Sequence, residues 1–233
     1  MNKPAYTVLV TGTNRGIGLE FVKQYAADGW NVIACCREPD ASRDLRALAQ
    51  AQAYDIEIIT LDVGDFVQID KVAEQLRDRK IDVLINNAGI YPESSLGDLD
   101  FDAWAEAFKI NCMAPLKMAE AFSAHIANSQ LQKIATLSSK MGSVDDNTSG
   151  GSYIYRTSKA AVNMAMKSLA IDLRPMGISV VTLHPGWVQT DMGGANGLIN
   201  TQTSVTGLRQ VIEGLSQHNT GKFIAYDGKE IAW

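Results

Sequence analysis

The sequence has no long apolar run, no excess of positive charge and few cysteines. No apolar stretch approaches the roughly 20 residues of a membrane-spanning helix, so we expect no membrane segment. The formal net charge is -5 at pH 7. This charge argues against a nucleic-acid partner, because such binding depends on neutralising phosphates with Lys and Arg. The apolar run at Val8–Val10 is also too short for a signal peptide.

The cysteines are Cys35, Cys36 and Cys112. Because two of them are adjacent, they provide neither a disulfide framework nor the ligand spacing of a metal site. We therefore expect packed thiols, no bound metal and a reducing compartment, the cytoplasm.

What the sequence does contain is a regular alternation of strand-like and helix-like segments. Its 233 residues suffice for one well-packed domain, and no repeat, linker or low-complexity tract divides them. Seven apolar runs are predicted to be strands: Tyr6–Val10, Asn31–Cys35, Glu57–Leu61, Val83–Ile85, Lys133–Leu137, Ile178–Leu183 and Phe223–Ala225. Because helical patterns separate them, we expect one α/β domain over residues 1–233, with a parallel sheet and helices on both faces.

Two long helices and a last, shorter one are predicted, and two loops are unusually polar or rich in glycine. The helices are Phe101–Asn128, Tyr155–Leu173 and Ser204–Ser216. Pro115 predicts a kink in the first of them. The loops Gly142–Ser152 and Thr190–Thr203 both follow strands, so we expect them at the edge where open α/β sheets bind ligands.

A glycine-rich loop, TGTNRGIG, follows the first predicted strand directly and precedes a helical pattern. Glycines at such a turn let the backbone approach a pyrophosphate at a helix N-terminus. The spacing Gly-x-x-x-Gly-x-Gly is wider than the common dinucleotide fingerprint. The candidate cofactor residues in this loop are Gly12, Asn14, Arg15, Gly16, Ile17 and Gly18.

The end of the second predicted strand indicates which nucleotide binds. An NAD site usually carries an acidic residue there, which bonds the ribose 2′-hydroxyl. Here the strand ends in Cys35 and Cys36, and Arg37 follows. Two guanidiniums, those of Arg15 and Arg37, suit a 2′-phosphate through paired hydrogen bonds and charge. We therefore expect NADP(H).

The stretch YIYRTSK sets a phenol and an ammonium at a helical spacing. Four residues turn through about 400° on a helix, so Tyr155 and Lys159 share a face. Tyr153 lies on roughly the opposite side. Tyr-x-x-x-Lys also occurs by chance in helices, so the pair acquires meaning only together with other motifs.

Those motifs occur in a fixed order. They are TGTNRGIG, LDV at 61–63, NNAG at 86–89, Asn111, LSS at 137–139, Tyr155 with Lys159, and HPGWVQT at 184–190. Together they resemble the short-chain dehydrogenase/reductase family over essentially the whole chain. YIYRTSKAAVN, HPGWVQTDMGG and YDGKEIAW are most similar to its C-factor and Sniffer-type carbonyl reductase branch. The resemblance implies a seven-stranded parallel Rossmann sheet ordered 3-2-1-4-5-6-7 and hydride transfer between a nicotinamide and a carbonyl or alcohol.

The resemblance also assigns roles to four catalytic residues. Tyr155 becomes the acid/base, and Lys159 its partner and the residue that holds the nicotinamide ribose. A free phenol has a pKa near 10, so nearby positive charge would help it to exchange protons. The pattern Ser-Ser-x-x-Gly selects Ser139 over Ser138 to bond the substrate oxygen, although the loop before Tyr155 is longer than usual. Asn111, with Pro115 close behind, matches the residue that holds a proton-relay water.

Further cofactor contacts follow from the same resemblance. Asp62 and Val63 would flank the adenine, and the turn 87–89 would pass the adenosine ribose. Pro185 and Gly186 would shape the nicotinamide floor, with Val188 and Thr190 at its carboxamide. The turn residues are Asn87, Ala88 and Gly89. We expect His184 to have a packing role, whereas Trp187 could line the pocket or cap the core.

Two other functions compete with an NADPH-dependent carbonyl reductase. A 3-oxoacyl thioester reductase of this fold would want basic residues at the entrance for an acidic carrier, but Tyr91–Asp100 and Gly142–Ser152 contain no Lys or Arg. A nucleotide-binding signalling or sensing protein would keep the fold without needing turnover. The short segment after Thr190 favours a small or promiscuous carbonyl substrate.

The resemblance also implies a homodimer or homotetramer that pairs through the two long helices. The apolar residues expected to supply that face are Trp104, Phe108, Met118, Phe122, Val162, Met166 and Leu169.

Overall fold

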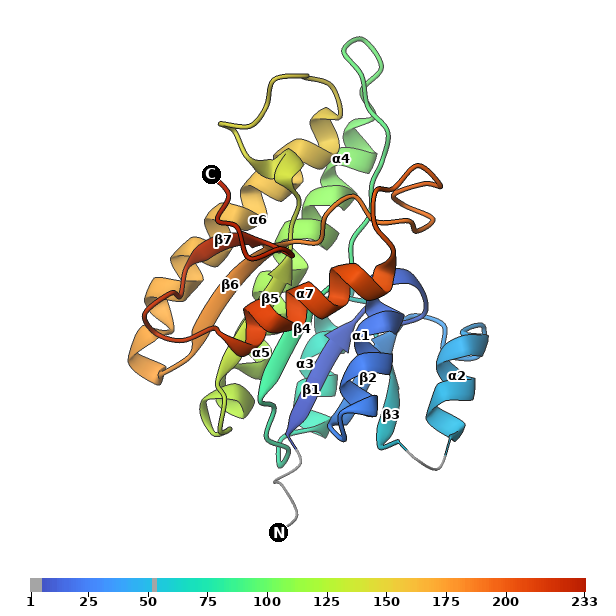
Figure 1. Ribbon diagram of the computed structural model, residues 1–233, viewed down its shortest axis with the longest axis vertical. Coiled ribbons are helices and arrows are strands. Elements are labelled where there is room, and N and C mark those ends of the chain that lie inside the picture. Colours follow the sequence, from blue (N-terminus) through green and yellow to red (C-terminus); the bar gives the residue numbers. More distant parts are fainter. Residues whose placement is uncertain (1–5, 52–53) are drawn as a thin grey trace.

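A computed structural model describes residues 6–51 and 54–233, so the first five residues of the N-terminal stretch lie outside it (Figure 1). One parallel sheet forms the centre, in the order β3-β2-β1-β4-β5-β6-β7. Its strands are β1 (Thr7–Thr11), β2 (Asn31–Cys36), β3 (Ile56–Thr60), β4 (Val83–Asn86), β5 (Lys133–Leu137), β6 (Ser179–His184) and β7 (Lys222–Ala225). The predicted fold class and strand order are confirmed.

Helices cover both faces of the sheet (Figure 1). One layer consists of α1 (Gly16–Ala27), α2 (Arg43–Gln50) and α7 (Thr201–Glu213). The other consists of α3 (Phe66–Gln75), α5 (Ala114–Ala127) and α6 (Tyr153–Asp172), with α4 (Phe101–Phe108) before α5. Connections between parallel strands must cross from one end of the sheet to the other, and helices of this length do so while burying their apolar stripes.

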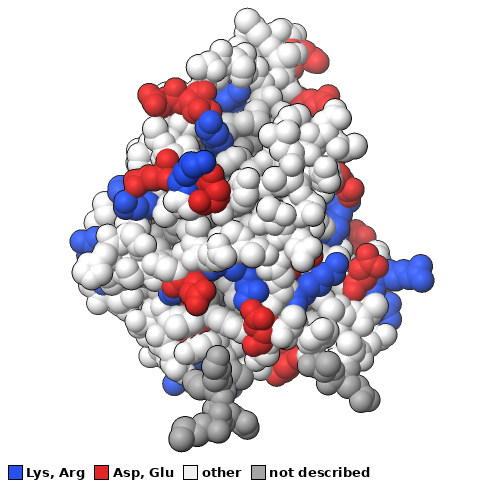
Figure 2. All heavy atoms as spheres, viewed as in Figure 1, with Lys and Arg blue, Asp and Glu red and all other residues white. Residues whose placement is uncertain are grey.

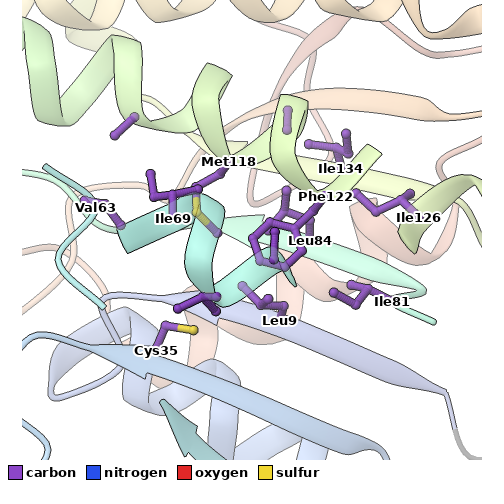
Figure 3. Close-up of a cluster of buried hydrophobic side chains, with 14 of the residues drawn as sticks. Leu9, Cys35, Val63, Ile69, Ile81, Leu84, Met118, Phe122, Ile126 and Ile134 are labelled. Atoms are coloured by element: carbon purple, nitrogen blue, oxygen red, sulfur yellow. The ribbon is translucent and has the colours of Figure 1, made fainter. Parts of the chain in front are cut away.

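The core therefore has two halves, one on each side of the sheet. Figure 3 shows the half under α3 and α5, where Ile69, Met118 and Phe122 pack toward Leu9 and Leu84 of the sheet. All five side chains are buried. Burying a Leu, Ile, Met or Phe side chain stabilises a fold by about 1.5–3 kcal/mol, so this packing holds α3 and α5 on the sheet.

The predicted helix over Phe101–Asn128 is interrupted. A π-helical turn, η1 (Lys109–Met113), separates α4 from α5. Pro115, the second residue of α5, has no N–H, so the carbonyl of Asn111 cannot receive the usual helical bond from it. The distortion expected at Pro115 thus appears as a wider turn just before it.

Other helix boundaries also differ from the prediction. Helix α6 begins at Tyr153, two residues early, and α7 begins at Thr201, three residues early. Helix α2 was not predicted, because Leu45 is its only buried residue and leaves little apolar periodicity to read. Two short 3₁₀ turns complete the chain: η2 (Lys140–Gly142) and η3 (Arg174–Met176).

The set of residues predicted to form an apolar face for self-association is mostly wrong. Most of the residues proposed for it are buried within a single chain: Met118, Phe122, Val162, Met166 and Leu169. They pack against the sheet, because this side of α5 and α6 covers β4, β5 and β6. An association surface on these helices must lie on their outer sides.

Acidic and basic side chains alternate over the face seen in Figure 2, without a large area of one sign. Within the described ranges, none of the helices combines the length and apolarity needed to cross a membrane.

Candidate active site

A cavity of about 530 Å³ lies along the carboxyl ends of the strands. It opens beside β1 and β4, where the strand order reverses, which is the usual ligand position in open α/β sheets. All the residues predicted to bind the cofactor line it, except Gly186 and Val188. These residues follow five different strands or belong to α6, so the fold brings together residues that are far apart in the sequence.

The glycine loop forms one end of this cavity, and its glycines are required sterically. Gly12 has φ +69°, and a side chain there would lie 2.9 Å from the Ala88 Cα. A Cβ on Gly18 would collide with the Gly12 carbonyl oxygen. Asn87 Nδ2 donates to the carbonyls of Thr11 (2.8 Å) and Gly12 (3.0 Å) and so ties β4 to the loop. Backbone therefore lines the cavity at close range, as a phosphate cradle requires.

The two predicted phosphate-binding arginines differ in their surroundings. Arg37 is exposed at the end of β2. Arg15 Nη1 lies 3.0 Å from Asp191 Oδ2, and both side chains are largely exposed. Asp191 follows β6, so this ion pair bridges the glycine loop and the Thr190–Thr203 segment. An exposed pair of this kind is weak, about 0–1 kcal/mol, and leaves Arg15 free to turn to another anion.

Tyr155 and Lys159 both line the cavity. Only 8% of Tyr155 and 4% of Lys159 is exposed. The Lys159 Nζ donates to the Leu137 carbonyl (2.9 Å) and lies 5.7 Å from the centre of the Tyr155 ring. Tyr153 is only half-buried. Helical periodicity thus selected the buried tyrosine of the two.

Burial shifts both titratable groups away from their charged forms. It raises the pKa of Tyr155 to about 12, while the Ser139 hydroxyl acts in the opposite direction and Tyr91 adds to the rise. It lowers the pKa of Lys159 to about 8, and the Cys112 thiol partly opposes this shift. Without a ligand, Tyr155 is therefore a neutral phenol at pH 7. Desolvation penalises its anion.

The two adjacent serines point in different directions, as alternation along an extended chain predicts. Ser138 donates to Asn163 Oδ1 (2.6 Å) and so engages α6. Ser139 starts the η2 turn, where its hydroxyl accepts a bond from the Met141 N–H (3.2 Å), and it is the serine that interacts with Tyr155. The longer loop between Ser139 and Tyr155 does not separate them.

Arg156 holds that longer loop in place. Its guanidinium donates to the carbonyls of Gly150 (3.2 Å) and Met141 (3.2 Å) and to the Ser149 hydroxyl (2.8 Å). Gly142 allows the start of the loop to pack on α6, because a Cβ there would lie 2.8 Å from the Lys159 Cβ. The additional residues therefore project outward from the site.

Asn111 is buried in the π-helical turn, where its side chain clamps the neighbouring loop. Its Oδ1 accepts from the Ile90 N–H (2.9 Å), and its Nδ2 donates to the Ile90 carbonyl (2.9 Å) and the Ser158 hydroxyl (3.0 Å). A Cβ on Gly89 would lie 3.1 Å from Asn111 Oδ1 and 3.6 Å from Lys159 Nζ, so the three residues adjoin. Both amide hydrogens are occupied by protein partners.

Two predicted cofactor residues lie behind the cavity wall. Val188 is buried and pairs with Ile199 in an isolated bridge. Gly186 has φ +85°, and a Cβ there would meet Ile199 and Tyr226 at 2.8 and 2.9 Å. Packing of the Thr190–Thr203 segment is thus sufficient reason for this glycine.

His184 and Trp187 form hydrogen bonds with the backbone of neighbouring loops. His184 Nδ1 accepts the Lys140 N–H (3.2 Å), and burial lowers its pKa to about 4, so the ring stays neutral. Trp187 is half-exposed, and its Nε1 donates to the Gly193 carbonyl (2.7 Å). The packing role expected for His184 agrees with this contact, and Trp187 belongs to a surface loop rather than capping the core.

Sequence reasoning missed several residues of the cavity wall. Cys36, Leu61 and Leu137 end strands or follow them directly. The rule that ligands bind at strand ends could have found them. Glu106 and Ile110 come from α4 and η1, and only tertiary packing brings them to the cavity.

Among residues 6–51 and 54–233, no cluster of three or more His, Cys, Asp or Glu side chains is arranged to hold a metal ion.

The sequence profile of short chain dehydrogenases matches residues 6–198. The chain is 46% identical over 154 residues to the C-signal of Myxococcus xanthus, and the aligned region covers 66% of this chain and 93% of that protein. The structure of the carbonyl reductase Sniffer of D. melanogaster has a TM-score of 0.92 at 35% identity, covering 98% of this chain and 100% of that one. The structure of an NADPH-bound carbonyl reductase from chicken fatty liver has a TM-score of 0.91 at 34% identity, and the match covers 98% of this chain and 99% of that one. The chain belongs to the short-chain dehydrogenase/reductase family.

Proposed function

We propose that this protein is an NADPH-dependent oxidoreductase that reduces an aldehyde or ketone to an alcohol, with Tyr155 as the proton donor. One observation carries the proposal: a buried phenol, a buried ammonium and a serine hydroxyl converge beside a cavity with a glycine cradle at its other end. Perturbed titratable groups in a cleft mark a catalytic site. The similar structures named as carbonyl reductases support the reaction class.

NADPH is the cofactor in this proposal. The cavity fits a dinucleotide phosphate, because the glycine loop lines it at the N-terminus of α1. Arg37 and Arg15 provide the charge for a 2′-phosphate. Asp62 and Val63 hold the adenine, and the turn 87–89 holds the adenosine ribose. Pro185 and Thr190 line the nicotinamide end, and Gly186 and Val188 support it from behind.

The chemistry needs a hydride and a proton, and the bound nicotinamide supplies the hydride. Tyr155 gives its hydroxyl proton to the carbonyl oxygen as negative charge develops there. Ser139 donates a hydrogen bond to that oxygen and orients the carbonyl. Lys159 stabilises the phenolate left behind and also bonds the nicotinamide ribose. A neutral Tyr155 at pH 7 is the protonation state that reduction requires.

Asn111 serves the return of a proton to Tyr155. We assign it a water on the path to Lys159, held by its backbone carbonyl, which Pro115 deprives of the usual helical donor. Its side chain keeps the β4–α4 loop in place instead.

A signalling role without turnover is the second candidate, favoured by the similarity to the protein named C-signal. The thioester reductase gains no such support. In the signalling case, biological activity would survive Tyr155→Phe but be lost when Gly18 is replaced by a bulky residue that blocks nucleotide binding.

The test is the loss of NADPH absorbance with a panel of aldehydes, quinones, ketosteroids and acetoacetyl thioesters. Turnover of an aldehyde or ketone is expected. Turnover of the thioester alone would move the substrate class to the acyl thioester reductases, and NADPH binding without turnover of any compound would favour the signalling role.

Assembly and compartment are also proposals. We propose a homodimer or homotetramer that uses the outer sides of the helices, where apolar residues are exposed: Phe101, Leu116, Met164 and Ile171. Light scattering at micromolar concentration should give a multiple of 25.3 kDa, and a monomer would contradict the proposal. The cysteines are free thiols, which suits the cytoplasm.

A further inference from the structure

A tyrosine outside the predicted site lies directly against Tyr155. Tyr91 follows β4 in the loop that leads to α4, and its ring centre is 4.5 Å from that of Tyr155, with the planes inclined by 55°. Aromatic pairs at this separation are attractive beyond their buried area, by about 0.5–1.5 kcal/mol. The Tyr155 ring thus has two neighbours of different character, the Tyr91 ring and the Lys159 ammonium.

The Tyr91 hydroxyl is anchored as well. It lies 2.8 Å from the hydroxyl of Ser152, the residue that precedes α6. Ser152 has φ +45°, a left-handed conformation that is costly for a serine, and its own side chain does not cap the helix. The strained residue is therefore held by contacts from another loop.

Ser94, three residues after Tyr91, supplies the missing cap. Its hydroxyl accepts the Ile154 N–H (3.0 Å), and its carbonyl accepts the Ser152 N–H (3.0 Å). At the other end, Asn111 clamps both backbone groups of Ile90. Tyr91 thus stands between two fixed points, and the same contacts close the first turn of α6, which carries Tyr155.

We propose that Tyr91 is a positioning residue for Tyr155: anchored on Ser152, its ring fixes the direction of the catalytic phenol and keeps water from it. This inference rests on the proposed function of Tyr155. It accounts for the burial of a side chain that must still reach a substrate. The dry surroundings favour the neutral phenol.

The experiment compares Tyr91→Leu, which removes the ring, with Tyr91→Phe, which removes only the hydroxyl. In the protein without cofactor, nitration by tetranitromethane at mildly alkaline pH reports how accessible and how ionised each phenol is. Mass spectrometry of the peptide that contains both Tyr153 and Tyr155 then gives an internal reference. We expect Tyr91→Leu to speed nitration of Tyr155 roughly tenfold, equivalent to about one pKa unit, and to leave Tyr153 unchanged.

Turnover gives the second readout. In Tyr91→Leu, kcat should fall on the order of tenfold, while NADPH affinity stays as in the parent. Tyr91→Phe should retain most of the activity. Ser152→Ala should match Tyr91→Phe, and the double variant should add nothing, because the two changes remove one bond.

Unchanged nitration of Tyr155 in Tyr91→Leu would overturn the positioning role, whatever happens to turnover. Faster nitration combined with full turnover of Tyr155→Phe would instead sustain the positioning role and overturn the proposed function. If the losses of turnover in Tyr91→Phe and Ser152→Ala were fully additive, the hydrogen bond between the two hydroxyls would not anchor Tyr91.

Discussion

Two cavities of similar size differ in almost everything else. One, of about 530 Å³, lies at the carboxyl ends of the strands, and the other, of about 590 Å³, lies between α3 and α5. The second is lined by charged side chains that pair with one another or with nearby groups, such as Arg77 with Glu74 at 3.1 Å and Arg79 with Glu57 at 3.2 Å. Volume therefore does not distinguish a site from a surface groove.

The two cavities differ in how far their polar groups are exposed to water. In the α3–α5 groove the charged side chains of the ion pairs remain largely in water, where each pair contributes about 0–1 kcal/mol. At the sheet edge, Tyr155 and Lys159 are desolvated, and the pKa of each moves toward the neutral form. Shifted groups that line a cleft, as these two do, indicate a candidate functional site.

Replacing Tyr155, the proposed proton donor, should have the largest effect. Tyr155→Phe should lower turnover by about 10²–10⁴, the usual loss of a general acid, with NADPH affinity nearly unchanged. Steady-state kinetics and cofactor titration measure both. Tyr153→Phe is the matched control two residues away, and equal turnover in Tyr155→Phe and the parent would remove the phenol from the mechanism.

Removing the buried ammonium should damage two steps together. Lys159→Met should lower turnover roughly 10²-fold, because the phenolate loses its cation. It should also weaken NADPH binding, unlike Tyr155→Phe, since the ribose loses a partner. Unaltered cofactor affinity in this variant would separate Lys159 from the ribose.

Cofactor choice should respond to one charge at the end of β2. Arg37→Asp should reduce or reverse the preference for NADPH over NADH, changing the ratio of dissociation constants at least about tenfold. The Coulomb term of a partly exposed charge pair at ~4 Å lies between about 1 and 4 kcal/mol. Fluorescence titration with both cofactors measures the ratio. Equal affinities for the two in the unaltered protein would refute the assignment of Arg37.

The desolvated lysine should also be visible in stability. Lys159 binds its proton more weakly in the folded state, with a pKa of about 8 against 10.5 when unfolded. The contribution of Lys159 to the parent's stability should therefore rise as pH increases from 8 to 10.5. Below pH 8, cofactor-free Lys159→Met should be more stable, on the order of 2 kcal/mol, and the gain should shrink across this window. A gain independent of pH in urea unfolding would contradict the shift.

The smallest effect is expected in the α3–α5 groove. Arg77→Ala removes a side chain that is 66% exposed, so unfolding free energy should change by no more than about 0.5 kcal/mol. The kinetic constants should stay within roughly twofold of the parent. A large loss of turnover would mean that the groove takes part in function, and the contrast between the two cavities would fail.

Local patterns predicted much of this protein. Alternating apolar runs indicated seven parallel strands, and the 3.6-residue period separated Tyr155 from Tyr153. The glycine loop and Arg37 are neighbours of strand ends, so their meeting at one edge followed from the parallel topology. The same local rules missed α2, which buries only Leu45. They predicted a kink at Pro115, where the structure has a π-helical turn just before it.

The order of motifs along the chain thus determined the family, the fold and the pair Tyr155 and Lys159, because each depends on residues close in sequence or on strand topology. Tertiary structure alone decided that Tyr91 packs on Tyr155, that Arg15 meets Asp191 and that the apolar faces of α5 and α6 are buried. These features depend on contacts between distant segments. Burial and pKa shifts depend on the same contacts, since desolvation arises from every neighbour that excludes water.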